Sequence, residues 1–137
     1  MTPRIDLCTQ ELFEEVKKNI EAFELDNRAL KPEEFLIVKN KEGLLGFGRM
    51  REFKGFVELC SLGIIEAKRL TGLGKQLTHA LIEKTNQTIY LVCIIPEYFE
   101  NFGFSICNSF PEEINDKLKY CTESLVVPEK YVVMRRN

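Results

Sequence analysis

The sequence lacks the residue patterns with which small proteins bind metals or form disulfides. His79 is its only histidine, and its five cysteines include no pair at close spacing. Because zinc and related metals need several such ligands at fixed spacing, we expect no metal site. An odd number of cysteines favours reduced thiols in the cytoplasm over a disulfide framework. Cys60 and Cys93 lie in apolar stretches and are expected to be small core residues.

Long apolar runs and an excess of positive charge are also missing. No apolar stretch reaches the ~20 residues of a membrane-spanning helix, and polar residues 1–10 lack the apolar centre of a secretory signal. We therefore expect no membrane partner. The formal net charge of −2 argues against nucleic acid as the main partner. At 137 residues and 45% hydrophobic, the chain is expected to form a single domain, residues 1–137, with its own core.

Apolar periodicity predicts a mixed α/β domain. Helices are expected at residues 10–23, 26–30, 72–85, 97–102 and 111–120, and strands at 35–39, 44–53, 56–65, 89–94, 104–107 and 131–135. In this order, three antiparallel strands precede a strand–helix–strand unit, which is followed by a short helix and further strands.

A glycine-containing turn between a strand and a helix is the strongest functional signal. It consists of Arg69, Leu70, Thr71, Gly72, Leu73, Gly74 and Lys75. Glycines let backbone N–H groups approach a ligand closely, and a helix N-terminus adds unpaired donors and the positive end of its dipole. Two cations, Arg69 and Lys75, flank the turn. The segment therefore predicts a binding site for a phosphate or pyrophosphate.

Two familiar phosphate-binding motifs do not fit this turn. A dinucleotide fingerprint needs a third glycine, but Leu77 stands at that position. A P-loop needs a glycine where Arg69 stands and a serine or threonine where Gln76 stands. Both motifs are excluded, which leaves a phosphate site of another kind.

Two stretches of the chain resemble a known family. Residues Ser61 to Leu77 resemble motif A of the GNAT acetyltransferase superfamily, a strand followed by Gln/Arg-x-x-Gly-x-Gly/Ala and a helix. Residues Tyr98 to Phe104 are similar to motif B, an aromatic-rich helix that ends in Gly-Phe before a strand. The two motifs occur in the family's order, which is more specific than either motif alone. The resemblance covers residues 35–106 best.

The resemblance implies a fold, a co-substrate and a set of contacts. The fold would be a mostly antiparallel central sheet of six or seven strands flanked by helices, with an acetyl-CoA cleft between splayed fourth and fifth strands. Residues 69–75 would contact the pyrophosphate, and Leu62, Gly63 and Ile64 the pantetheine arm. Gly63 agrees with a bulge or a close backbone approach, although it could merely relieve packing.

Glu58 and Tyr98 are the candidate catalytic residues. An acceptor amine is mostly protonated at neutral pH, so a partly buried carboxylate can activate it by accepting a proton, directly or through water. Glu58 stands where several members of the superfamily carry a catalytic glutamate; the alternative is a solvated acid. Many relatives protonate the leaving thiolate with a motif B tyrosine, but Phe99 stands at that position here. Tyr98 would replace it, or would be a packing aromatic.

The C-terminal residues hint at the acceptor. Residues 110–121 and the strand ending at Arg136 look similar to small acetyltransferases related to the acetylating domain of N-acetylglutamate synthase. This similarity implies transfer to a primary amine such as a free amino acid, with Arg49 or Arg51 receiving its carboxylate. Both arginines could instead be cations on an exposed strand face. A protein lysine or N-terminal acetyltransferase and a non-catalytic acyl-CoA-binding module stay open, and an exposed last strand could pair across a homodimer.

Overall fold

The computed structural model describes residues 3–65, 71–124 and 130–137. By its internal contacts the chain divides into two compact units. The first unit comprises Met1–Arg51 and Leu59–Thr85, and the second comprises Glu52–Glu58 and Asn86–Asn137. The single domain expected from chain length therefore stays a prediction.

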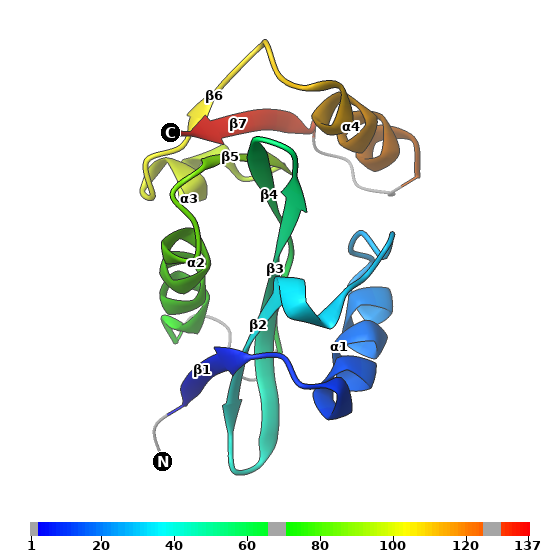
Figure 1. Cartoon of the computed structure of the whole chain (residues 1–137), viewed down its shortest axis with the longest axis vertical. Coiled ribbons are helices and arrows are strands. Elements are labelled where there is room, and N and C mark those ends of the chain that lie inside the picture. The colour runs from blue at the N-terminus through cyan, green and yellow to red at the C-terminus, as the bar shows by residue number, and fades with distance from the viewer. Residues whose placement is uncertain (1–2, 66–70, 125–129) are drawn as a thin grey trace. The chain divides into compact units, whose positions relative to one another are not determined.

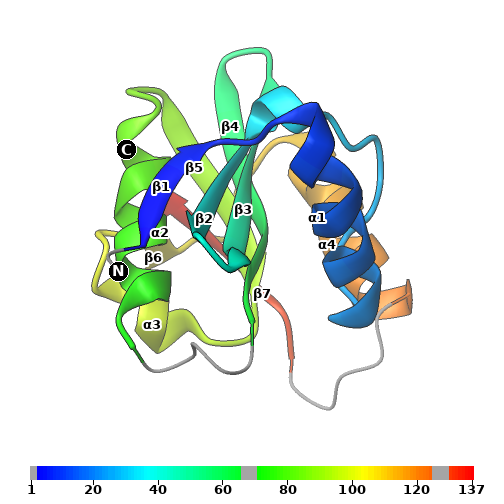
Figure 2. The same ribbon diagram turned by 90° about the horizontal axis from the view of Figure 1, so that it is seen from below.

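The first unit contains strands packed between two helices. Its elements are β1 (Arg4–Leu7), α1 (Gln10–Ala22), the 3-10 turn η1 (Pro32–Glu34), β2 (Phe35–Asn40), α2 (Leu73–Glu83), most of β3 (Gly43–Phe53) and the end of β4 (Phe56–Ile64). Strand β2 pairs antiparallel with β1 on one side and with β3 on the other. Helices α1 and α2 lie on opposite faces of β2 and β3 (Figures 1 and 2).

Helix α1 forms because a cap and an apolar stripe coincide. The Thr9 hydroxyl accepts a hydrogen bond from the Leu12 N–H at 3.2 Å, which satisfies one of the unpaired donors of the first turn. The buried stripe of the helix packs against β2 and β3 and forms the core of this unit with Phe13, Val16, Ile20, Phe35, Ile37, Leu44 and Phe47.

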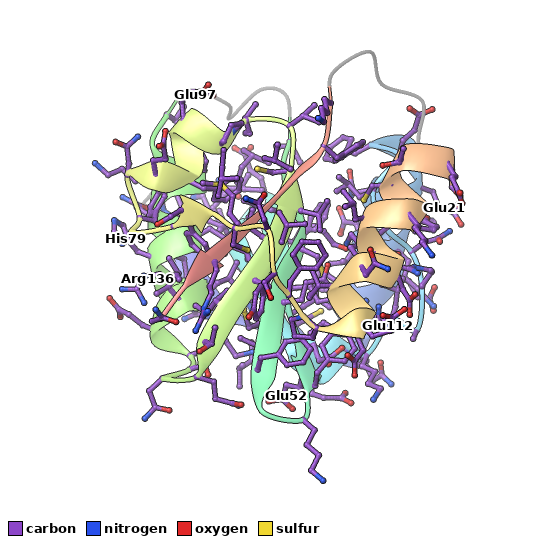
Figure 3. The ribbon with its side chains drawn as sticks, turned by 90° about the horizontal axis from the view of Figure 1, so that it is seen from above. Glu21, Glu52, His79, Glu97, Glu112 and Arg136 are labelled. Atoms are coloured by element: carbon purple, nitrogen blue, oxygen red, sulfur yellow. The ribbon has the colours of Figure 1, made fainter. Side chains whose placement is uncertain are left out.

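The second unit has its own strands, helices and core. Its elements are β5 (Thr88–Cys93), α3 (Pro96–Glu100), β6 (Ser105–Ile106), α4 (Glu112–Ser124) and β7 (Val132–Arg136). Strand β7 pairs antiparallel with both β5 and β6, and residues 56–58 of β4 pair parallel with β5. Helix α4 lies beside β5 and β7, with side chains filling the space between them (Figure 3). The core of the second unit is formed by Phe56, Tyr90, Ile114 and Val133.

The strands follow the order β1-β2-β3-β4-β5-β7-β6 in one seven-stranded sheet of the described residues. The β4–β5 pairing is parallel, whereas β1–β2, β2–β3, β5–β7 and β6–β7 are antiparallel. This arrangement confirms the predicted mixed α/β fold with a mostly antiparallel sheet. Among the described residues, every helix is too short or too polar to cross a bilayer.

Three details of the predicted elements are wrong. No strand was predicted at residues 4–7, where β1 lies, because its pairing is imposed by β2 through the backbone and leaves little apolar pattern in the sequence. The helix expected at residues 26–30 is an irregular segment, since Ala29 has a φ of +49° and the Asp26 carboxylate accepts a hydrogen bond from the Arg28 N–H. The last strand, β7, is not a free edge, because β5 and β6 flank it; β6 occupies the edge.

The cysteines agree with their predicted role. All five cysteines lie within the described residues and none of them forms a disulfide; both Cys60 and Cys93 are buried. Burial raises the pKa of the Cys93 thiol, the charge of Glu97 adds to this shift, and a backbone hydrogen bond at Ile95 opposes it. Cys93 also lies 3.7 Å from the Met134 sulfur atom. Cys60 and Cys93 are therefore residues of the core.

Candidate functional site

The N-terminus of α2 is open and lacks a side-chain cap among the described residues. Gly72 precedes the helix with φ +86° and ψ −2°, the left-handed conformation that glycine adopts most easily. A Cβ atom on Gly72 would meet no described heavy atom within 4 Å, so space lies in front of this backbone. Thr71, Gly72 and Lys75 are exposed. Such a terminus offers N–H donors and a positive dipole end to an anion.

The remaining residues of the predicted anion site differ in how far they are buried. Leu73 is buried on the apolar face of α2, so its side chain does not line the predicted anion site. Gly74 is half-buried, and its carbonyl accepts a 2.7 Å hydrogen bond from the Thr78 hydroxyl. Arg69 and Leu70 lie outside the described residues.

The end of β4 carries a local change of backbone direction. Ser61 has a φ of +49°, an uncommon conformation for a residue other than glycine. Leu62, Gly63 and Ile64 follow it and are half-buried. A Cβ atom on Gly63 would come within 2.8 Å of the Phe47 ring and 2.9 Å of the Phe23 ring. The space in front of Gly63 is therefore filled by two phenylalanine rings, as expected if this glycine relieves packing. Its role as a pantetheine contact stays a prediction.

Glu58 is a buried member of an ion pair. Its side chain is 1% exposed, and its Oε2 atom lies 2.8 Å from the Lys117 Nζ atom of α4. The solvated alternative for Glu58 is wrong, because β5 pairs beside it and α4 contributes the buried Lys117. Oε2 accepts no hydrogen bond from the described residues, so the contact with Lys117 is an ion pair without hydrogen-bond geometry.

Tyr98 lies on α3 among aromatic rings. Its ring centroid is 5.0 Å from that of Phe99 and 5.2 Å from that of Phe102. Phe99 is buried, whereas Tyr98 is half-buried, as expected for neighbours that point to different sides of a helix. The phenol ring thus has packing partners, and its role as a proton donor stays a prediction.

The two arginines of β3 differ. Arg49 is fully buried: its Nε and Nη2 atoms donate to the Glu34 carboxylate at 3.0 and 2.7 Å. Nη1 donates to the Arg28 carbonyl at 2.8 Å, and Nη2 to the Ala29 carbonyl at 2.6 Å. The exposed-face alternative is therefore wrong for Arg49, and these bonds occupy the donors that a bidentate substrate contact would need. Arg51 is half-buried.

The structure brings some of the predicted residues into one unit and leaves others apart. Leu62, Gly63 and Ile64 share the first unit with residues 71–75 and with both arginines, whereas Glu58 and Tyr98 belong to the second. The cleft expected between the fourth and fifth strands stays a prediction.

Sequence reasoning missed the residues that pair with these groups. The pairing of Lys117 could have been predicted from the sequence. Lys117 lies with Ile114 and Cys121 on the buried stripe of α4, where an unpaired lysine is rare. Glu34 and Ser61 carried no such sequence signal, since their partners are distant in sequence.

Comparisons with known proteins support the fold. Neither the protein-family models nor the curated proteins include a match to this sequence. Among solved structures, N-acetylglutamate synthase from Neisseria gonorrhoeae, complexed with coenzyme A and N-acetyl-glutamate, superposes with a TM-score of 0.78 at 15% identity. The alignment covers 99% of this chain but 35% of that one, so this chain spans about a third of the synthase.

Two further structures match over nearly the full length of both chains. Arabidopsis thaliana Naa50, in complex with the bisubstrate analogue CoA-Ac-MVNAL, has a TM-score of 0.72 at 15% identity and covers 100% of this chain and 99% of its own. An acetyltransferase of the GNAT family from Staphylococcus aureus has a TM-score of 0.68 at 15% identity, with 99% of each chain covered. The chain therefore has the fold of GNAT acetyltransferases, as its two motifs predicted.

Proposed function

We propose that this protein is an acetyl-CoA-dependent N-acetyltransferase that acts on a primary amine. The observation that carries the proposal is the N-terminus of α2 in a GNAT fold: the first turn has no side-chain cap, and a Cβ atom on Gly72 would meet no described atom within 4 Å. Such a terminus suits the pyrophosphate of CoA. The exposed ammonium of Lys75 adds a positive charge to it, and Arg69 is proposed to add another.

The proposed reaction is attack of the amine nitrogen on the thioester carbonyl carbon. A C–N bond forms, the C–S bond breaks, and one proton leaves the nitrogen. Glu58 is proposed to accept that proton, through water because its carboxylate is buried beside Lys117. Tyr98 is proposed to return a proton to the departing sulfur atom. Leu62, Gly63 and Ile64 would align the pantetheine arm.

A small amine such as an amino acid is the proposed acceptor. The Neisseria synthase was crystallised with N-acetyl-glutamate, which supports this class, whereas the peptide analogue bound to the Arabidopsis protein supports an N-terminal amine as the alternative. Arg51 is the proposed carboxylate receptor, because the donors of Arg49 are already engaged. The protein is proposed to act in the cytoplasm, and a homodimer would have to use a surface other than β7.

Binding of CoA is the first test of this proposal. A ligand that binds only the folded state stabilises it by about 2.7 kcal/mol at 100 times its dissociation constant. We therefore expect millimolar CoA and acetyl-CoA to raise the melting temperature in a thermal-shift assay, and NADH or ATP to do so much less. A flat response to CoA would remove the proposal.

A matched pair of glycine variants tests whether the pyrophosphate of CoA binds at Gly72. Gly72→Asp should abolish CoA binding, because its carboxylate would occupy and repel the pyrophosphate site. Gly55→Asp is the control: Gly55 has a similar φ of +88°, is also exposed and has no atom within 4 Å, but lies in the β3–β4 turn. Both variants carry the same backbone strain and charge. Equal CoA affinity in the two folded variants would place the pyrophosphate elsewhere.

An acceptor panel separates the alternatives. Free amino acids, peptides with free N-termini and lysine peptides would be offered with acetyl-CoA, and release of free CoA would be measured. CoA binding without turnover of any amine would favour the non-catalytic binding module over the enzyme.

A further inference from the structure

The segment of residues 24–34, between α1 and β2, is held by buried polar side chains. Four such side chains of the first unit converge on it: Asp26, Glu34, Arg49 and Ser61. Burial of polar groups is unfavourable unless each is hydrogen-bonded, so a cluster of them specifies one arrangement of the chain.

Side chains from two strands hold three carbonyls of the segment. The Ser61 hydroxyl of β4 donates to the Asp26 carbonyl at 2.9 Å. Arg49 of β3 donates to the carbonyls of Arg28 and Ala29. The Asp26 carboxylate accepts from the Arg28 N–H at 3.0 Å and from its guanidinium at 2.9 Å. Between α1 and η1, the carbonyls of residues 26, 28 and 29 are therefore held by side chains of the strands.

The Ser61–Asp26 hydrogen bond also constrains the backbone of β4. Ser61 has a left-handed φ of +49°, and a conformation of this kind persists only where the surroundings enforce it. Its hydrogen bond to Asp26 is a contact that can do so, since Asp26 is itself buried and bonded. Residues 62–64, the proposed pantetheine contacts, come directly after this residue. The bond to the 24–34 segment thus lies directly before the proposed pantetheine contacts in the chain.

We propose that Ser61 is a positioning residue which couples CoA binding at residues 62–64 to the order of the 24–34 segment through the Ser61–Asp26 hydrogen bond. The inference rests on the proposed function, because it takes CoA as the ligand of this strand. Binding of CoA fixes the strand, the strand fixes the Ser61 hydroxyl, and the hydroxyl fixes the Asp26 carbonyl.

Hydrogen–deuterium exchange with CoA as the probe tests the coupling without knowledge of the acceptor. In the wild-type protein, saturating CoA should slow amide exchange both at residues 71–75 and, by roughly threefold or more, at residues 26–30. In Ser61→Ala, the first protection should remain and the second should disappear. Affinity for CoA should fall about three- to tenfold, the usual effect of losing one hydrogen bond.

Two further variants keep the test decisive. Ser61→Gly removes the hydroxyl but accepts a φ of +49° without strain, so it should also lose protection of residues 26–30 even if Ser61→Ala folds poorly. Ser105→Ala, on exposed β6 of the second unit, should behave as wild type.

The outcomes separate this inference from the proposed function. Protection of residues 71–75 alone in the wild-type protein would overturn the coupling and leave CoA binding intact. Undiminished protection of residues 26–30 in both Ser61 variants would overturn it as well. Protection nowhere in the wild-type protein would remove CoA binding and the coupling with it.

Discussion

Each of the two units contains a buried ion pair, and the two pairs differ in how completely their atoms are bonded. In the first unit, Arg49 donates four hydrogen bonds to the Glu34 carboxylate and to two carbonyls. In the second unit, Lys117 lies 2.8 Å from Glu58, whose Oε2 atom accepts no hydrogen bond from the described residues. A buried ion pair offsets its loss of hydration only when further hydrogen bonds complete it.

The difference suggests different roles for the two carboxylates. Glu34 is bonded as a structural group, because its Oε1 atom accepts from two nitrogens of a rigid guanidinium fork. Glu58 lies beside the single ammonium of Lys117, an arrangement compatible with its proposed role as proton acceptor. Three variants test this contrast, and their expected effects decrease in the order given.

Breaking the pair of the first unit should have the largest effect. Arg49→Met would leave the Glu34 carboxylate buried without its cation and remove the donors of two carbonyls. We expect a loss of about 5 kcal/mol in the free energy of unfolding, at the upper end for a broken buried pair. Urea denaturation measures it. Arg51→Met, at a half-buried arginine of the same strand, is the control and should lose far less. Similar losses in both would contradict the structural role of Arg49.

Glu58→Gln should have the next largest effect, on the rate of acetylation. If Glu58 accepts the amine proton, the rate near pH 7 should fall by roughly two to four orders of magnitude, the usual contribution of a general base. Affinity for CoA should stay nearly unchanged. The defect should shrink as pH rises towards the pKa of the acceptor amine, because free amine then forms without help. A defect of equal size at every pH would indicate that Glu58 has a positional or structural role.

Lys117→Met should have the smallest effect of the three. It leaves the Glu58 carboxylate buried without a cation, and we expect a loss of about 3 kcal/mol in the free energy of unfolding. The double variant Glu58→Leu/Lys117→Met should recover most of that stability, because apolar side chains can replace a buried pair. It should not recover acetylation. A loss as large as that of Arg49→Met would show that the two pairs are equally structural and end the contrast.

The predicted elements succeeded where local pattern and tertiary environment agree. The stripe of α1 and the glycine before α2 are local signals, so their positions are readable from residue order alone. The failures share a cause. β1 pairs through its backbone, and the carbonyls of the irregular residues 26–30 are bound by Arg49 and Ser61 from strands far along the chain.

The sequence by itself determined the mixed α/β fold, the position of the glycine turn before α2 and the identity of Glu58 as the acid of β4, because periodicity, glycine spacing and residue type are local properties. Only the tertiary structure decided which charges are buried together. It paired Glu58 with Lys117, committed Arg49 to Glu34, and gave Ser61 a left-handed backbone conformation. Partners of this kind meet only after the chain has folded, since burial and distance in space leave no mark on the spacing of residues along it.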